Sequence, residues 1–328
     1  APGVVGGFAA IALLAPLSMR FAFRGRERMA WLAFCSVLGQ LGWASSALVF
    51  VARGLPLVVL PWLLLAAEGL RVGLLLSGFR WQFGPIRMPR RRQLVAWTRA
   101  SVPASAGRIA RGLLYFIDLL LLGLFAPLSE VGLYAVALRL PLFAITAAAM
   151  VQQAVFPRVA QLLGRRELGG QGALMHQTLL AATALGLSAA LTLGDAGGAW
   201  LSTLFGERFR AAAPLMAILC WRIPLSAAAG LLRNLVCAAD PLRDARIAQT
   251  ATATAAAAVV LGAWAFGATG CAWGMVFGEA VSCLLYGRAA RGSMRWPDST
   301  STPVLASMAV AAVALAGWLW RPDGLGDS

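Results

Sequence analysis

Residues 60–78 read LPWLLLAAEGLRVGLLLSG, and residues 271–289 read CAWGMVFGEAVSCLLYGRA. Both stretches are apolar, and each contains a tryptophan that is followed six residues later by a single glutamate. Each is long enough to form a helix that crosses a bilayer. The matched residues are Trp62 and Glu68 in the first stretch, and Trp273 and Glu279 in the second.

The 211-residue offset between these two stretches also relates the stretches that precede them. It carries residues 3–19 onto 214–230 and residues 31–52 onto 242–263. Three consecutive apolar stretches are therefore repeated, while three further stretches between the copies have no counterpart. We predict a repeat unit of six helices whose first copy lacks three upstream helices. Because six is even, the two copies share one orientation and form parallel repeats, as in transporters.

The composition agrees with a chain that lies mostly in a membrane. Of 328 residues, 60% are hydrophobic and only 12% are charged, where a soluble domain carries about 25% charged residues. An ordinary soluble enzyme is excluded. We predict an all-α polytopic membrane protein with ten transmembrane helices. They span residues 3–19, 31–52, 55–78, 101–126, 129–157, 173–193, 211–238, 243–265, 268–287 and 302–320.

The distribution of arginine predicts the orientation. All 28 basic residues are arginines, and the net charge is +15. Alternate loops contain 18 of these arginines, whereas the loops between them contain four. The positive-inside rule therefore places the first set in the cytoplasm and both ends of this chain on the outer side of the membrane, which is the periplasm if the membrane is a bacterial inner membrane. It also accounts for the charge without nucleic-acid binding. The arginine-rich loops are 20–28, 79–100, 158–172, 239–247 and 287–301.

The longest polar stretch, Arg80–Arg99, separates the two copies of the repeat. Its end, Gln93–Arg99, has the pattern of a short amphipathic helix lying on anionic headgroups. A solvated linker with orienting charges is the alternative. The predicted domains are the last three helices of an N-terminal lobe (1–78), a basic cytoplasmic linker (79–100), a six-helix C-terminal lobe (101–290) and an extra transmembrane helix with a tail (291–328).

Several short motifs occur in a recognisable order. They are Ser101-Val102-Pro103, Asp118 followed by aliphatic residues, Val131-Gly132-Leu133-Tyr134-Ala135-Val136-Ala137, Phe156-Pro157-Arg158, Phe205-Gly206-Glu207-Arg208-Phe209 and Gly267-Ala268-Thr269-Gly270. Over residues 1–290 the chain resembles the polysaccharide and O-antigen flippases of the multidrug/oligosaccharidyl-lipid/polysaccharide superfamily. The resemblance implies a two-lobe, MATE-like transporter fold whose first three helices would lie upstream of Ala1.

Charged residues inside the apolar stretches are candidates for function, because each costs about 2.5–3.5 kcal/mol near the bilayer centre. Arg139 and Arg222 each precede a proline by two residues, where a loosened backbone and a cavity would coincide. We expect them to face the substrate, with a structural ion pair as the alternative. Arg108, Arg111 and Arg233 either bind substrate too or extend to the cytoplasmic interface.

The carboxylates allow two interpretations, ion coupling or structural pairing. Glu68 and Arg71 lie three residues apart on one helix and can pair with each other. Asp118 could neutralise an arginine of a neighbouring helix, and Glu279 has the same two possible roles.

Signatures of catalysis are absent. The chain has no lysine for a nucleotide-binding loop, no HExxH and no GxSxG motif, so we expect no enzyme, no cofactor and no metal site. We predict a flippase of the bacterial inner membrane that moves a polyprenyl-diphosphate-linked oligosaccharide by alternating access, among membrane lipids and beside polymerase and glycosyltransferase machinery. The alternatives are a multidrug or cation exporter of the same superfamily and a membrane-embedded glycosyltransferase or polymerase.

Overall fold

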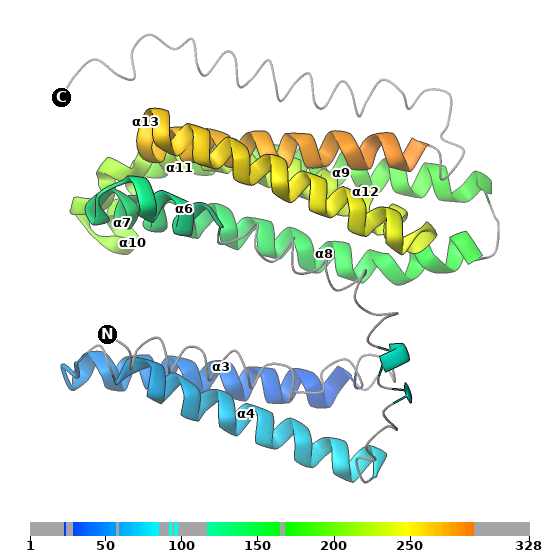
Figure 1. Ribbon diagram of the computed structural model, residues 1–328, viewed down its shortest axis with the longest axis horizontal. Coiled ribbons are helices and arrows are strands. Elements are labelled where there is room, and N and C mark those ends of the chain that lie inside the picture. Colours follow the sequence, from blue (N-terminus) through cyan, green and yellow to red (C-terminus); the bar gives the residue numbers. More distant parts are fainter. Residues whose placement is uncertain are drawn as a thin grey trace. The chain divides into compact units, whose positions relative to one another are not determined.

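The computed structural model describes residues 23, 29–56, 59–84, 92–93, 95–97, 117–164 and 168–291. Within these ranges all regular secondary structure is helical (Figure 1). The chain divides into two compact units, Ala1–Gln93 and Leu94–Ser328. The boundary between them falls inside the predicted linker, residues 79–100.

Six helices in the described ranges are long and apolar enough to cross a membrane, which agrees with the predicted all-α polytopic membrane protein. They span Ala30–Ala52, Leu60–Phe83, Leu128–Gln153, Met175–Asp195, Glu207–Ala239 and Pro241–Arg291. The last of these contains two predicted stretches, 243–265 and 268–287. Predicted stretches 3–19 and 302–320, and residues 101–116 of a third, lie outside the described residues. The count of ten helices and the repeat therefore remain predictions.

In its described residues, the first unit contains two long antiparallel helices, α3 (Met29–Ala52) and α4 (Leu60–Phe83). Their direction follows from their contacts, because Gly42 in the second half of α3 packs on Ala67 in the first half of α4, while Gly78 late in α4 packs on Trp31 early in α3. A small residue at each contact lets the helix backbones approach closely.

The second unit contains the remaining described helices. They are α6 (Ile117–Phe125), α7 (Leu128–Ala137), α8 (Arg139–Gly164), α9 (Leu168–Asp195), α10 (Gly197–Phe205), the 3-10 helix η2 (Glu207–Ala212), α11 (Ala213–Cys220), α12 (Arg222–Ala239) and α13 (Pro241–Arg291). Its long helices α8, α9, α12 and α13 lie side by side (Figure 1).

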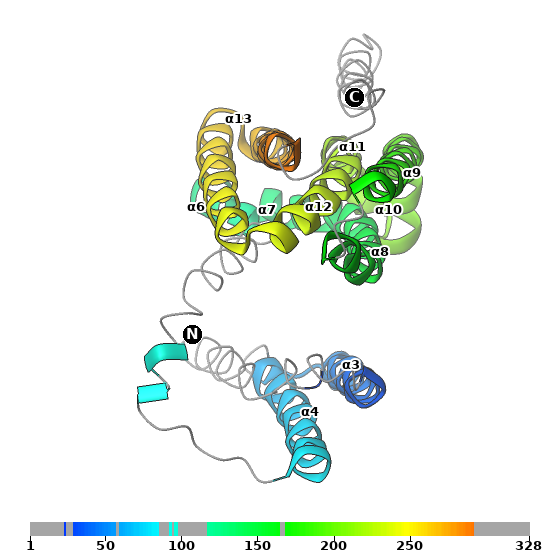
Figure 2. The ribbon, with the colours of Figure 1, turned by 90° about the vertical axis from the view of Figure 1, so that its right-hand side faces the viewer.

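Helix α12 is the central helix of the second unit. It packs against α8 and α9 on one side and against α13 on the other (Figure 2). Together with η2 and α11 it forms a candidate span whose most apolar window is 89% buried inside the unit. A polar side chain on this helix therefore faces protein and not lipid.

Helix α13 is a hairpin. The backbone leaves the helical conformation at Phe266 and Gly267, where Gly267 has φ 59°. The first arm, residues 241–265, runs antiparallel to the second arm, residues 268–291, since Gly262 packs on Gly270 and Ala255 on Gly278. Two of the predicted stretches are thus two helices joined by a turn of only two residues.

Candidate functional site

Arg139 and Arg222 stand at equivalent breaks in two long helices. Leu138 separates α7 from α8, and Trp221 separates α11 from α12. A proline follows each arginine by two residues, and its ring nitrogen cannot donate to the carbonyl four residues earlier. The hydrogen-bond ladder is thus interrupted beside both arginines, while Leu138 and Trp221 keep right-handed helical backbone angles. The side chains differ, because Arg139 is exposed on the second unit and Arg222 is buried.

Arg222 lies between two carboxylates that come from different helices. Its Nη1 is 3.7 Å from Oδ2 of Asp118 on α6, and its Nη2 is 3.7 Å from Oε1 of Glu279 on the second arm of α13. The exposed fraction is 1% for Arg222 and 0% for Asp118. We call these three residues the Arg222 triad. The triad holds one positive and two negative charges away from solvent.

The contacts within the triad are loose, and the contacts around Asp118 are tight. The Tyr134 hydroxyl donates to Oδ2 of Asp118 at 3.0 Å, and the backbone N–H of Leu119 donates to Oδ1 at 2.9 Å. In contrast, Nε and Nη1 of Arg222 have no hydrogen-bond partner among the described atoms. Asp118 is therefore fixed in place by hydrogen bonds, while two of the three guanidinium nitrogens of Arg222 are not.

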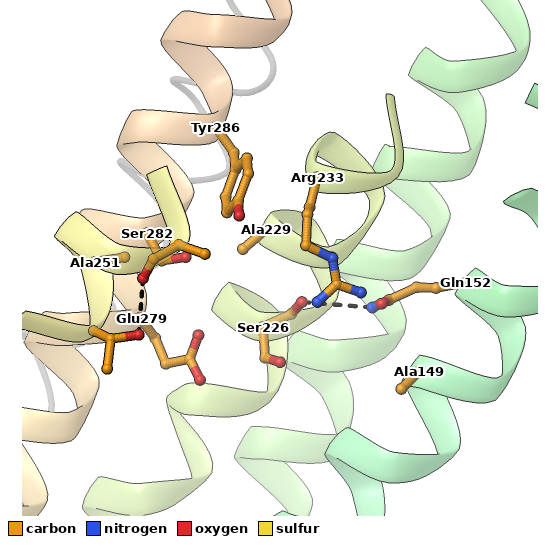
Figure 3. Close-up of a pocket in the computed structure, with 12 residues that line it drawn as sticks. Ala149, Gln152, Ser226, Ala229, Arg233, Ala251, Glu279, Ser282 and Tyr286 are labelled. Atoms are coloured by element: carbon orange, nitrogen blue, oxygen red, sulfur yellow. Dashed lines mark hydrogen bonds between the residues drawn. The ribbon is translucent and has the colours of Figure 1, made fainter. Parts of the chain in front are cut away.

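A pocket opens beside the triad, and Glu279 belongs to both. In Figure 3, Glu279 and Arg233 point into this pocket from α13 and α12. We call it the Arg233 pocket. Its lining comes from α8, α12 and both arms of α13 and comprises Ala149, Gln152, Ser226, Ala229, Gly230, Arg233, Ala248, Ala251, Thr252, Glu279, Ser282 and Tyr286.

Arg233 is the cation available to a ligand in this pocket. It is half-buried and has no ion-pair partner within the described ranges. Its planar guanidinium can bind two oxygens of one phosphate or carboxylate, and it stays protonated at every relevant pH. The hydroxyl groups of Ser226 and Ser282 add further hydrogen-bonding groups to the lining, while the Tyr286 hydroxyl donates to Oδ1 of Asp244 at 2.8 Å. The arrangement suits an anionic, hydroxyl-bearing ligand.

A polar contact between α8 and α12 shapes one wall of the pocket. The Gln152 amide donates to the backbone carbonyl of Ala227 at 3.3 Å, and the Asn234 amide donates to the backbone carbonyl of Gln152 at 3.0 Å. Gly230 leaves room for Gln152, because a Cβ there would overlap the Gln152 amide. These bonds join α8 and α12 beside the pocket.

The other predicted residues do not join this site. Glu68 and Arg71 are hydrogen-bonded to each other along α4 of the first unit. Arg108 and Arg111 lie outside the described residues. For Arg222 the structure shows the ion pairing that was the alternative, with acidic partners that come from other helices and not from its own.

Sequence reasoning missed three residues that the structure brings into play. Gln152 and Tyr134 carry no charge, so a search for charges inside apolar stretches passes over them. Glu130, at the start of α7, accepts a 2.6 Å hydrogen bond from the backbone N–H of Ala268 and so caps the second arm of α13. The glycines of Gly267-Ala268-Thr269-Gly270 indicated a turn in the sequence. Nothing in the sequence indicated that Glu130, 138 residues before Ala268, would bind this turn.

Comparisons with known proteins identify a family for the first half of the chain. Residues 8–163 match the sequence pattern of a family described as polysaccharide biosynthesis protein. The matched range includes α3, α4, α6 and α7 and almost all of α8. A comparison with curated proteins found no match.

Proposed function

We propose, from the premise that this chain belongs over residues 8–163 to the polysaccharide biosynthesis family of polysaccharide and O-antigen flippases, that it flips a polyprenyl-diphosphate-linked oligosaccharide. The substrate moves from the cytoplasmic to the periplasmic leaflet of a bacterial inner membrane. The lobes alternate access to the bound headgroup, and the lipid tail stays in the bilayer. Polymerase and glycosyltransferase machinery would act on the same lipid on either side of this step.

The Arg233 pocket carries this proposal. A diphosphate headgroup needs a cation, and Arg233 lines the pocket without a salt bridge among the described residues. The pocket hydroxyls suit a sugar. Arg233 also repels a cationic drug, which speaks against the multidrug exporter. Arg139, exposed at the break before α8, is a second candidate contact, and Arg108 and Arg111 remain predicted contacts.

Arg222 takes a different role in this proposal. Its charge is already shared by Asp118 and Glu279, and it is 1% exposed. A phosphate could reach it only by displacing two carboxylates. We therefore assign Arg222 to the packing of α6, α12 and α13, and Arg233 to the substrate.

The packing of the two hairpins supports the proposed repeat. In the first unit Ala67 packs on Gly42, and in the second unit Gly278 packs on Ala255. Gly278 is the counterpart of Ala67 at the 211-residue offset, and Ala255 lies two residues beyond the counterpart of Gly42. Two helical hairpins with nearly the same register are what a duplicated unit would give.

The test is complementation of a strain that lacks its own flippase, with lipid-linked oligosaccharide on the cytoplasmic leaflet as the readout. A charge-assisted contact to phosphate is worth about 1.5–3 kcal/mol, or about ten- to hundredfold in affinity. Arg233→Gln should therefore cause accumulation at normal protein abundance. Arg233→Lys should restore transport in part, because lysine keeps the charge and loses the planar fork.

Arg288→Gln is the matched control. Arg288 lies on the same arm of α13 as the pocket residues but is exposed outside the lining. It should support normal transport. Full transport by Arg233→Gln at normal abundance would show that the pocket does not bind the diphosphate.

A further inference from the structure

The α13 hairpin has a groove on one side that is lined by its own two arms. The groove has a volume of about 760 Å³ and lies near the turn of the hairpin, beyond the residues of α13 that line the Arg233 pocket. Its floor is glycine, because Gly262, Gly270 and Gly274 lie where the backbones of the two arms touch. We call it the hairpin groove.

The walls of the hairpin groove are aromatic. Phe266 and Phe277 are 75% and 56% exposed, and Trp273 is partly buried against the core of the second unit. The lining contains one hydroxyl group, on Thr269, and no charged side chain. Since both arms belong to a helix apolar enough to cross a membrane, a partner for this groove has to be apolar and has to lie within the bilayer.

The chain supplies such a partner directly after α13. The predicted transmembrane stretch 302–320 follows Arg291 after a connection of ten residues, 292–301. Ten extended residues reach about 33 Å, whereas packed helices lie about 8–10 Å apart. The connection is therefore long enough for the stretch to return beside the hairpin, and consecutive helices usually pack as neighbours.

The composition of the stretch suits the shape of the groove. Eight of the twelve residues 306–317 are Ala, Gly or Ser. A helix of small residues is narrow on every side, and membrane helices approach each other closely through such residues. The groove has the opposite character, with large aromatic side chains above a glycine floor. Each surface thus supplies what the other lacks.

The two predicted stretches also match in depth. The middle of 268–287 lies at Phe277, and the middle of 302–320 lies at Ala311. Because consecutive spans cross the bilayer in opposite directions, positions nearer the hairpin turn meet positions nearer the end of the stretch. Phe277 is then level with Ala311, and the turn is level with Trp320. A tryptophan at that level fits the aromatic belt of a membrane interface.

We propose that residues 302–320 form a helix that packs antiparallel to the second arm of α13 and fills the hairpin groove. This inference goes beyond the proposed function and does not depend on it, because it uses neither the Arg233 pocket nor the Arg222 triad. The packing gives Phe266 and Phe277 a partner from their own chain.

The experiment is photo-cross-linking of the full chain in membranes. Benzoylphenylalanine, a photo-reactive phenylalanine analogue, replaces Phe277 in one variant and Phe266 in another. Both side chains are exposed aromatics, so the analogue fits either position, and each variant tests the packing if the other does not fold. Trypsin separates α13 from the stretch at Arg291 and Arg295, so mass spectrometry can identify the joined peptides.

We expect both variants to form a cross-link within one chain to the peptide that contains 302–320. The attachment point should lie near Ala311 for Phe277 and near Trp320 for Phe266. Leu261 is the matched control, since it lies on the first arm, is 66% exposed and is not part of the groove lining. Benzoylphenylalanine at Leu261 should form this cross-link at least tenfold less often.

Four outcomes would overturn the proposal. Cross-links of Phe277 to lipid alone would show that the bilayer fills the groove. Cross-linked dimers would show that a second copy covers it, and cross-links to another part of the same chain would show that a different segment does. Attachment points in the reverse order would contradict the antiparallel packing.

Discussion

Replacing Arg222 by Gln should destabilise the second unit strongly, because it leaves two buried carboxylates facing each other. At 3.7 Å, each attraction to the guanidinium is worth about 4 kcal/mol for an effective dielectric constant near 20. The desolvation cost of the arginine, several kcal/mol, offsets part of this gain. Removing one partner from a buried charge cluster costs about 3–5 kcal/mol net, and we expect a loss of that size.

The assay is equilibrium unfolding in mixed micelles by titration with sodium dodecyl sulfate, followed by tryptophan fluorescence. Adding Glu279→Gln to the Arg222→Gln variant removes one of the two carboxylates that have lost their cation. The double variant should regain about 2 kcal/mol in the free energy of unfolding. Arg210→Gln is the control, because the Arg210–Glu207 pair is 3.9 Å apart and its side chains are 71% and 77% exposed. Its loss should stay below about 1 kcal/mol.

Two results would refute this reasoning. If Arg222→Gln unfolded at the wild-type detergent fraction, the triad would contribute nothing to stability. If the double variant were no more stable than the single variant, the carboxylates would not be the source of the cost. If Arg222→Gln were stable but could not transport, Arg222 would be assigned to substrate binding.

Three further predictions concern the fold and the topology. Gly267→Ala should cost about 1–3 kcal/mol in the same titration, because φ is 59° and the new Cβ would lie 2.5 Å from Oε1 of Glu130; wild-type stability would contradict the capped turn. Gly186→Val should cost about 1–3 kcal/mol, because a Cβ there lies 2.8 Å from Cα of Pro224 and would push α9 away from α12; an unchanged midpoint would place the two helices farther apart. A cysteine at Gln82 should react with an impermeant thiol reagent only after the inner membrane is opened, and labelling in intact spheroplasts would reverse the predicted orientation.

Features that depend on neighbouring residues could be predicted from the sequence. Apolar stretches of membrane-crossing length indicated the all-helical membrane class, and the described helices agree with it. Glu68 and Arg71 could be matched because residues three apart share one face of a helix. The interruptions beside Arg139 and Arg222 followed from the missing N–H of Pro141 and Pro224.

Features that depend on which helices touch could not be predicted in this way. Arg139 and Arg222 have the same local sequence pattern, yet one is exposed and the other is 1% exposed. The difference arises because Arg222 opens the central helix of its unit, where Asp118 and Glu279 arrive from helices far away in the sequence. Local periodicity sets the direction of a side chain on its own helix. The partner that it meets there depends on how the helices pack, and that packing places Arg222 between two carboxylates and Arg233 in the lining of the pocket.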